Sequence, residues 1–239
     1  MKRSVIKEKY IILKGYPFTK YGKAIGKILL IALAGIFGQP TPTDIRDKKV
    51  IWDVKARDIE EYTTTFSENA VKATLHTDTQ YKMHPERYVL LAVIRKAISG
   101  GDTLLLDGKK ILKQLKRTKR GRACLKILQK NKFPFRVPTV YTKKRKEDNP
   151  EVIWCPVISK RPLLRFRKDT IMRGFACTME NEEMQRAVEY FEQYCNRHKE
   201  VRKVLLQRGE IIIMKNDEML HGRTEFKDKK RHLLRIRMQ

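Results

Sequence analysis

Short runs of β-forming residues, each ended by a turn signal, constrain the fold of this chain more than any other feature. The run Tyr88–Ile94 is continuously apolar, which is typical of a strand buried on both faces. Gly100 and Gly101 mark a turn before the next run. We expect strands over the following segments: Ser4–Leu13, Lys49–Val54, Val71–Thr79, Tyr88–Ile94, Thr103–Leu106, Val152–Val157, Leu163–Arg167, Glu210–Met214 and Leu233–Ile236.

Few segments have a helical pattern. Tyr21–Ile36 is predicted to be helical, and the glycine and prolines that follow stop it. Gly108–Gln129 is predicted as a helix with a very basic face, and Asn181–Val204 carries an apolar stripe at helical spacing. Many short strands with two or three helices predict a mainly β fold with flanking helices, a jelly-roll barrel of the double-stranded β-helix, cupin-like kind. The length fits one domain over residues 1–239.

The charge balance is extreme. The chain has 54 Lys and Arg against 27 Asp and Glu, a net charge of +27. Such an excess indicates either an anionic partner, such as nucleic acid, acidic lipid or a charged metabolite, or a lysine-rich solvated surface. The run Lys116–Arg122 has the same two interpretations, a solvated face or a nucleic-acid contact.

Cysteine usage and hydropathy bear on the compartment. Four cysteines show no Cys-x-x-Cys spacing, so we expect neither a zinc nor a disulfide framework, and free thiols fit a cytoplasmic protein. No secretory signal is expected at the N-terminus. The segment Ile28–Phe37 is strongly apolar but too short to span a bilayer. It is predicted to be a buried helix, with a membrane-surface role as the alternative.

His76, Asp78 and His221 are the candidate metal ligands. On a strand, the His76-Thr77-Asp78 spacing puts an imidazole and a carboxylate on the same side, because side chains alternate. A second imidazole from a distant strand, His221, would complete a face of two histidines and one carboxylate. That face leaves open metal positions and favours non-haem Fe(II) that activates oxygen. His84, His198 and His232 are interpreted as structural or surface residues.

The C-terminal run His221-Gly222-Arg223-Thr224-Glu225-Phe226, followed by Arg231-His232-Leu233-Leu234-Arg235, resembles the closing signature of a known family. It is similar to the taurine dioxygenase (TauD/TfdA) and clavaminate synthase-like Fe(II)/2-oxoglutarate oxygenases. His76-Thr77-Asp78 resembles their proximal iron motif, and Gly100-Gly101-Asp102-Thr103 resembles a segment whose hydroxyl helps to bind 2-oxoglutarate. Asn216 resembles part of the approach to the distal histidine.

The resemblance implies roles for these residues. Iron would be held by His76, Asp78 and His221. Arg235, 14 positions after His221, would grip the far carboxylate of 2-oxoglutarate, with Thr103 donating a hydroxyl and Arg231 assisting. The cofactors would be Fe(II), 2-oxoglutarate and O₂. The carboxylate of Asp78 argues against a halogenase, in which a small residue makes room for halide.

The expected reaction is hydroxylation of an unactivated C–H bond of a small molecule, an amino acid or another carboxylate-bearing metabolite, with release of succinate and CO₂. Desaturation remains open, as do a nucleic-acid- or protein-modifying oxygenase that uses the basic surface, and a non-catalytic binding protein. The sequence does not predict an oligomeric state.

Several residues are candidates for the substrate wall. Arg165 and Arg167 would contact an anionic group, although both could instead face solvent on an edge strand. Gln80 and Tyr81 follow the iron motif directly, and Ser67 and Asn69 precede it. Arg223 would pair with Asp78 or Asp217 and orient the site.

Overall fold

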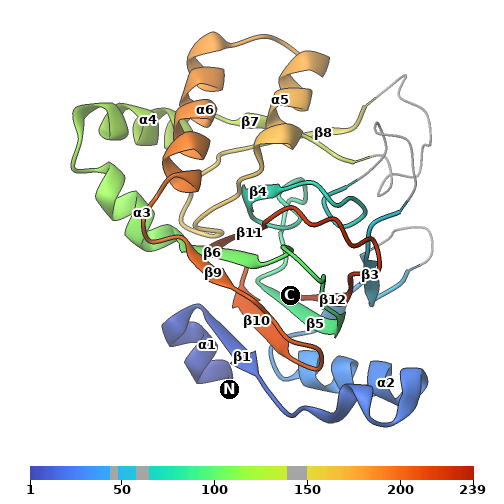
Figure 1. Cartoon of the computed structure of the whole chain (residues 1–239). Coiled ribbons are helices and arrows are strands. Elements are labelled where there is room, and N and C mark those ends of the chain that lie inside the picture. Colours follow the sequence, from blue (N-terminus) through green and yellow to red (C-terminus); the bar gives the residue numbers. More distant parts are fainter. Residues whose placement is uncertain (44–47, 58–64, 139–149) are drawn as a thin grey trace.

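The computed structural model describes residues 1–43, 48–57, 65–138 and 150–239. Two antiparallel sheets lie one above the other in the middle of the molecule (Figure 1). The larger has the order β1-β10-β5-β12-β2, with β3 also paired to β12, and the smaller has the order β4-β11-β6-β9. Their strands are β1 (Tyr10–Leu13), β2 (Pro40–Thr41), β3 (Trp52–Val54), β4 (Ala73–His76), β5 (Tyr88–Arg95), β6 (Thr103–Asp107), β9 (Arg202–Val204), β10 (Ile211–Lys215), β11 (Met219–Arg223) and β12 (His232–Met238).

Helices cover the outer faces of the sheets. Two lie by the larger sheet, at the bottom of Figure 1, and four lie by the smaller one with the hairpin of β7 (Phe133–Arg136) and β8 (Val152–Cys155). The first group is α1 (Lys2–Glu8) and α2 (Gly22–Gly35), with the 3₁₀ turn η1 (Pro17–Thr19) between them. The second group is α3 (Gly108–Leu115), α4 (Lys119–Lys130), α5 (Lys168–Cys177) and α6 (Glu182–Asn196). The predicted mainly β jelly roll with flanking helices is confirmed.

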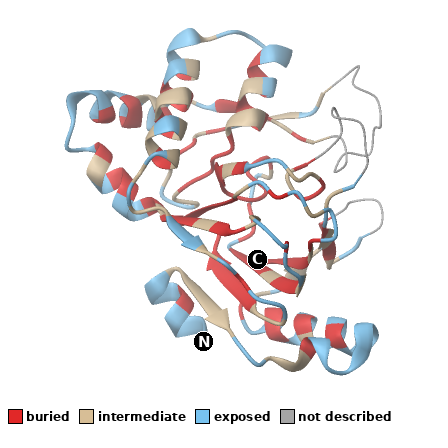
Figure 2. Ribbon diagram, viewed as in Figure 1, coloured by how far each residue is buried: buried red, intermediate tan, exposed pale blue. Residues whose placement is uncertain are grey.

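Three apolar clusters separate these layers. One joins α1 and α2 to the outer face of the larger sheet, one fills the space between the sheets, and one joins the smaller sheet to α3–α6. The buried strands in the centre of Figure 2 belong to more than one cluster. Along β10, Ile211 and Ile213 face α2, whereas Ile212 and Met214 face the other sheet. Burial on both faces explains why such strands are continuously apolar.

The same alternation places polar side chains inside the molecule. On β12, Leu234 and Ile236 pack in the outer cluster, while Leu233 packs between the sheets. Arg235 and Arg237 have the same parity as Leu233, so they point inward although they are charged. A buried charge is costly unless it is paired, which indicates a polar site between the sheets.

Two strand predictions were wrong. The first half of Ser4–Leu13 forms α1, because its charged residues favour a helix and only Val5 is buried. Leu163–Arg167 forms no strand apart from a single bridge between Ile158 and Leu164. Its backbone N–H groups instead donate to separate loops, including Arg165 N to the carbonyl of Val157 at 2.9 Å.

The helix predictions were right in position but too long. Gly108–Gln129 is divided into α3 and α4, because Thr118 caps a new helix through a hydrogen bond from the N–H of Gly121 at 3.0 Å. The segment Asn181–Val204 ends as a helix at Asn196, and its last residues form β9. The apolar segment Ile28–Phe37 is buried on one side only. Two polar segments of the sequence, Thr63–Ser67 and Lys143–Pro150, are described only over residues 65–67 and 150.

Candidate metal centre

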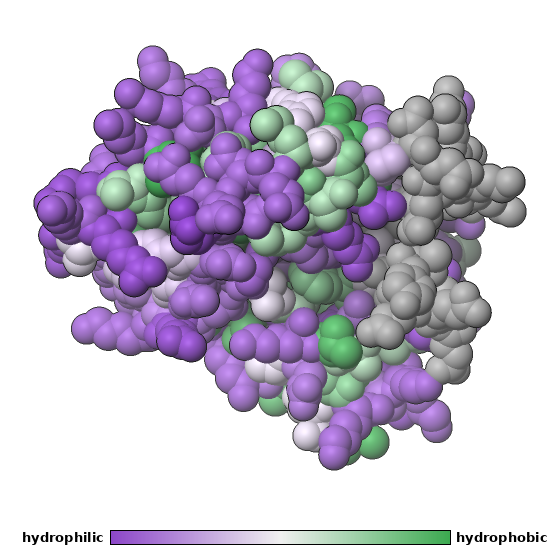
Figure 3. Space-filling model, turned by 90° about the horizontal axis from the view of Figure 1, so that it is seen from above, coloured by the Kyte–Doolittle hydropathy of each residue, from purple (hydrophilic) through white to green (hydrophobic). Residues whose placement is uncertain are grey.

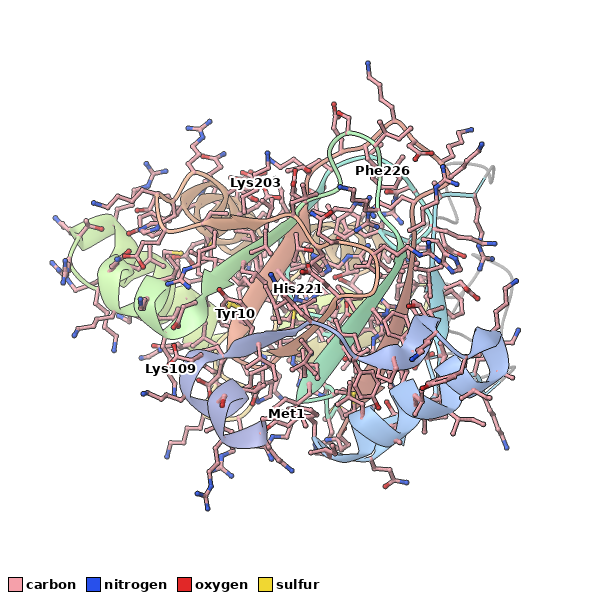
Figure 4. The ribbon with its side chains drawn as sticks, turned by 60° about the horizontal axis from the view of Figure 1, so that its bottom comes forward. Met1, Tyr10, Lys109, Lys203, His221 and Phe226 are labelled. Carbon is pink, nitrogen blue, oxygen red and sulfur yellow. The ribbon has the colours of Figure 1, made fainter. Side chains whose placement is uncertain are left out.

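Three side chains, two from the neighbouring strands β4 and β11 and one from the turn after β4, converge between the sheets. His76 ends β4 and lies opposite His221 in the antiparallel pairing of β4 with β11, and Asp78 follows two residues later. The Nε2 atoms of His76 and His221 lie 3.7 and 3.8 Å from Oδ1 of Asp78. All three candidate ligand atoms lie within 4.8 Å of one another, too far apart for hydrogen bonds but facing a common point. Figure 4 shows His221 in the interior.

The state of the imidazoles suits metal binding. Nδ1 of His76 lies 2.7 Å from the carbonyl oxygen of Thr74, so this nitrogen carries the proton and Nε2 keeps its lone pair. Burial, with the nearby His221, lowers the pKa of His76 to about 4, which keeps the ring neutral near pH 7. Two imidazoles and one carboxylate, all buried, are a donor set that fits Fe(II).

Asn216 fixes the backbone at Asp78. Its Oδ1 accepts a hydrogen bond from the N–H of Asp78 at 2.7 Å, and its Nδ2 donates to the carbonyls of Asp78 at 3.1 Å and Glu86 at 2.7 Å. Asp78 lies beyond the end of β4, and the next residue, Thr79, has a φ of 52°. The carboxylate is therefore aimed by Asn216 and not by strand alternation, which corrects the argument made from the His-x-Asp spacing.

Two guanidinium groups contact the other oxygen of Asp78. Nη1 of Arg235 lies 3.2 Å from Oδ2, and Nε of Arg237 donates to the same oxygen at 2.9 Å. Burial alone would raise the pKa of Asp78, but these two arginines outweigh it and hold that pKa well below its usual range. Arg237 was not among the predicted site residues. Arg237 lies two residues after Arg235 on β12, so both side chains are on the same face of the strand, and this spacing could have identified Arg237.

Arg231 and Thr103 lie at another part of the same pocket. Both line it together with His76, Asp78 and Arg235. Arg231 is buried and donates to the carbonyl of Gly101 at 3.3 Å, so it is part of the interior and not of the surface. Burial lowers the pKa of Arg231 to about 10, which leaves it charged near neutral pH.

Arg223 does not pair with Asp78 or Asp217, which corrects that prediction. Its guanidinium donates to the backbone carbonyls of Phe66, Asn69 and Val71 at 3.0, 2.9 and 2.6 Å. The side chain therefore holds the segment before β4, including Ser67, against the pocket.

Of the predicted substrate residues, Ser67 lines the pocket with the metal ligands. Arg167 lies behind Phe66, close to His76. Its guanidinium lies 4.1 Å from the ring centroid of Phe66, which in turn lies 5.1 Å from the ring of His76. Two of its nitrogens donate to the carboxylate of Asp169 at 2.7 Å each. The predicted solvent-facing alternative was wrong, because this side chain is almost fully buried.

Arg165, Gln80 and Tyr81 are not brought to the pocket. Arg165 is buried and donates to the backbone carbonyls of Gln80, Lys82 and Met83, so it braces the loop after the metal motif. Gln80 donates to the hydroxyl of Thr170 at 3.0 Å, and Tyr81 packs in the cluster under the helices. Outside the site, His232 pairs with Asp53 at 2.6 Å, in agreement with its predicted structural role.

The comparison with protein families agrees with this geometry. The family model described as "Taurine catabolism dioxygenase TauD, TfdA family" matches residues 7–237, which is most of the chain. A search of curated proteins gave no match.

Solved structures show the same fold. An asparagine oxygenase in complex with Fe(II), 2S,3S-3-hydroxyasparagine and succinate aligns with a TM-score of 0.75 and 17% identity, covering 99% of this chain and 76% of that one. The non-haem iron oxygenase OrfP in complex with Fe, succinate and (3R,4R)-dihydroxy-L-Arg aligns with a TM-score of 0.70 and 13% identity, covering 99% and 78%. At these identities the likeness concerns the fold alone.

Proposed function

Because the chain belongs to the taurine catabolism dioxygenase TauD/TfdA family, it is an Fe(II)- and 2-oxoglutarate-dependent dioxygenase, and we propose that it hydroxylates an unactivated C–H bond of an amino acid or a similar carboxylate-bearing small molecule. The observation that carries this proposal is the convergence of His76, Asp78 and His221 in a pocket that also contains Arg231 and Arg235.

His76, Asp78 and His221 would hold the iron, with Asp78 Oδ1 and the two Nε2 atoms as ligands. The bound iron supplies oxygen activation, coupled to oxidation of 2-oxoglutarate to succinate and CO₂. Arg235 and Arg237 keep Asp78 ionised, and Asn216 fixes its backbone, so the carboxylate is ready to coordinate. Buried apolar neighbours limit the access of water.

The arginines of the pocket divide into two positions, and we assign them different ligands. Arg231 lies beside Gly101, in the turn before β12 and four residues before Arg235, and it lines the pocket with Thr103. The far carboxylate of 2-oxoglutarate must lie away from the metal that its keto-acid end chelates. Arg231 and Thr103 fit that requirement better than Arg235, which already contacts a metal ligand.

Arg235 is then placed for the substrate. Its Nη1 lies 3.2 Å from Asp78, so a group held by this guanidinium lies next to the metal. A guanidinium recognises a carboxylate by paired, charge-assisted hydrogen bonds. This supports a carboxylate-bearing substrate and revises the expectation that Arg235 grips the co-substrate. The two structural relatives act on amino acids, as their bound products indicate.

A metabolite screen tests the proposal. The purified protein with Fe(II), 2-oxoglutarate and O₂ is given pooled amino acids first and other small carboxylates next, and succinate release is measured. We expect at least one pool to stimulate release well above the uncoupled rate, with no stimulation in His76→Ala. If oligonucleotides or protein extracts stimulate release and no small molecule does, the alternative of a macromolecular substrate, which the charge of +27 favours, replaces it.

A further inference from the structure

Helix α2 forms an outermost layer of the molecule, against the larger sheet. Its inner face packs through Leu30, Leu33 and Phe37 on that sheet, in the cluster that contains Leu90 and Ile236. The metal centre lies on the other side of the sheet, between the two sheets, so the outer face of α2 is not part of the site already described (Figure 1).

The outer face of α2 is apolar, which is unusual for a solvent-facing helix. Ile25, Ile28, Ile31 and Ile36 are 50%, 64%, 41% and 48% exposed. At 100° per residue these four side chains fall within an arc of about 140° whose centre is opposite Leu30 and Phe37. No residue from 28 to 39 is charged. Single exposed apolar residues are ordinary, whereas three isoleucines on one side of a helix and a fourth at its C-cap mark an interaction surface.

Basic residues lie near one edge of this face. Residues 1–38 contain eight Lys and Arg and one acidic residue, Glu8. Lys20 lies just before α2, and Lys23 and Lys27 lie in its first two turns; all three are exposed. Helix α1 lies on the same side of the molecule, which comes forward in Figure 4, and it adds further exposed lysine and arginine side chains and Met1. By contrast, the opposite face in Figure 3 is covered mainly by hydrophilic residues.

The size and charge of the surface distinguish two candidate partners, a second copy of this chain and an anionic lipid bilayer. A helix of 14 residues is about 21 Å long, so one face about 10 Å wide offers roughly 200 Å², far below the ~800 Å² per partner of a stable interface. A second copy would also bring the same lysines together. A bilayer with anionic headgroups takes an apolar helix face into its interface and neutralises the basic edge. No helix among the described residues is long and apolar enough to cross a membrane.

We propose that the outer face of α2 binds the surface of an anionic lipid bilayer, with Ile25, Ile28, Ile31 and Ile36 in the interface and Lys20, Lys23 and Lys27 at the headgroups. The helix lies parallel to the membrane plane, and the larger sheet separates it from the metal centre.

Co-sedimentation with vesicles tests this directly. The whole protein is mixed with vesicles of phosphatidylcholine alone, or of phosphatidylcholine with phosphatidylglycerol. We expect binding to the anionic vesicles at least tenfold stronger than to the neutral ones. Ile25→Gln/Ile28→Gln should weaken it at least tenfold, and so should Lys23→Glu/Lys27→Glu. These side chains are exposed, so the variants should melt as the wild type does.

Matched controls distinguish binding by this face from nonspecific electrostatic or hydrophobic binding to the vesicles. Ile98 is 86% exposed and lies between β5 and β6, so Ile98→Gln should bind as the wild type does. Lys119→Glu/Lys126→Glu makes the same charge change on α4 and should weaken binding much less than the α2 pair. The proposal is overturned if wild type ignores anionic vesicles, if the isoleucine variant binds normally, if the α4 pair matters equally, or if lipid-free wild type is a dimer that Ile25→Gln/Ile28→Gln dissociates.

Discussion

Asp78 is the residue on which the site depends, because its two carboxylate oxygens have different partners. Oδ2 accepts from Arg237 and contacts Arg235, while Oδ1 faces the imidazoles of His76 and His221. Two cations on one oxygen stabilise the ionised form and orient the other oxygen toward the candidate metal position.

Arg237 is therefore a positioning residue. Arg237→Gln removes the 2.9 Å hydrogen bond to Asp78, and we expect Fe(II) affinity to fall about 10- to 100-fold. Arg237→Lys should recover part of the loss. Anaerobic Fe(II) titration measures the effect. Unchanged iron affinity in Arg237→Gln, with only a lower melting temperature, would show that Arg237 is merely structural.

Substitutions of the two pocket arginines, Arg231 and Arg235, should raise the KM of different ligands. Arg231→Gln is expected to raise the KM for 2-oxoglutarate at least tenfold, because a charge-assisted carboxylate contact is worth about 2 kcal/mol. Arg235→Gln should raise the KM for the organic substrate by a similar factor and change that for 2-oxoglutarate much less. Steady-state succinate release measures both, and the opposite pattern would restore Arg235 as the co-substrate residue.

At the scale of elements, close packing of α5 on β7 gives a stability prediction. A Cβ on Gly174 of α5 would lie 2.0 Å from the carbonyl oxygen of Pro134, a contact that the backbone must relieve. Gly174→Ala gains about 1 kcal/mol of helix propensity but incurs about 1–3 kcal/mol of overpacking, so we expect net destabilisation. Gly35→Ala, at the open end of α2, meets nothing within 4 Å and should be neutral or stabilising.

Urea unfolding of both glycine variants gives the comparison. A stabilised Gly174→Ala would mean that α5 can move away from β7 at little cost, contrary to the close approach in the structure.

The sequence predicts an element well when the residues of that element alone determine its structure. The strands β5 and β10 were predicted because burial on both faces makes them continuously apolar, and β12 was predicted from the shorter run Leu233–Ile236. The segment Leu163–Arg167 has a composition close to that of β12, but its partners are distant loops, and that information is not in the segment. The ligands His76 and His221 were predicted from a motif, whereas the roles of Asn216 and Arg237 depend on tertiary contacts with Asp78.

At the scale of the whole molecule, one carboxylate ties together segments far apart in the sequence. Glu218, in the turn between β10 and β11, lies 2.7 Å from Nζ of Lys9 and 3.0 Å from Nζ of Lys109, and it also pairs with Lys215. The residue before β1, the first turn of α3 and this turn therefore meet at one charge cluster, in which Glu218 is buried and Lys109 is exposed.

This cluster predicts an acid dependence of stability. Burial would raise the pKa of Glu218, but Lys215, Lys9 and Lys109 outweigh it and lower that pKa to about 2. Because the folded pKa lies below the unfolded one, the stabilisation is present above about pH 4.5 and is lost as the pH falls toward 2. Its size is roughly 2 kcal/mol. Glu218→Gln should lower the free energy of unfolding at pH 7 and flatten its fall below pH 4.5. A variant with the wild-type pH profile would exclude this role.

Iron binding by the three ligands tests the central claim most directly. In anaerobic Fe(II) titrations, we expect the wild type to bind one equivalent, and His76→Ala, Asp78→Ala and His221→Ala each to lose at least 100-fold in affinity. His232→Ala, which changes a histidine paired with Asp53 outside the site, should bind as the wild type does. Wild-type iron affinity in His221→Ala would contradict the account, because it would place the metal on residues other than the three that converge between the sheets.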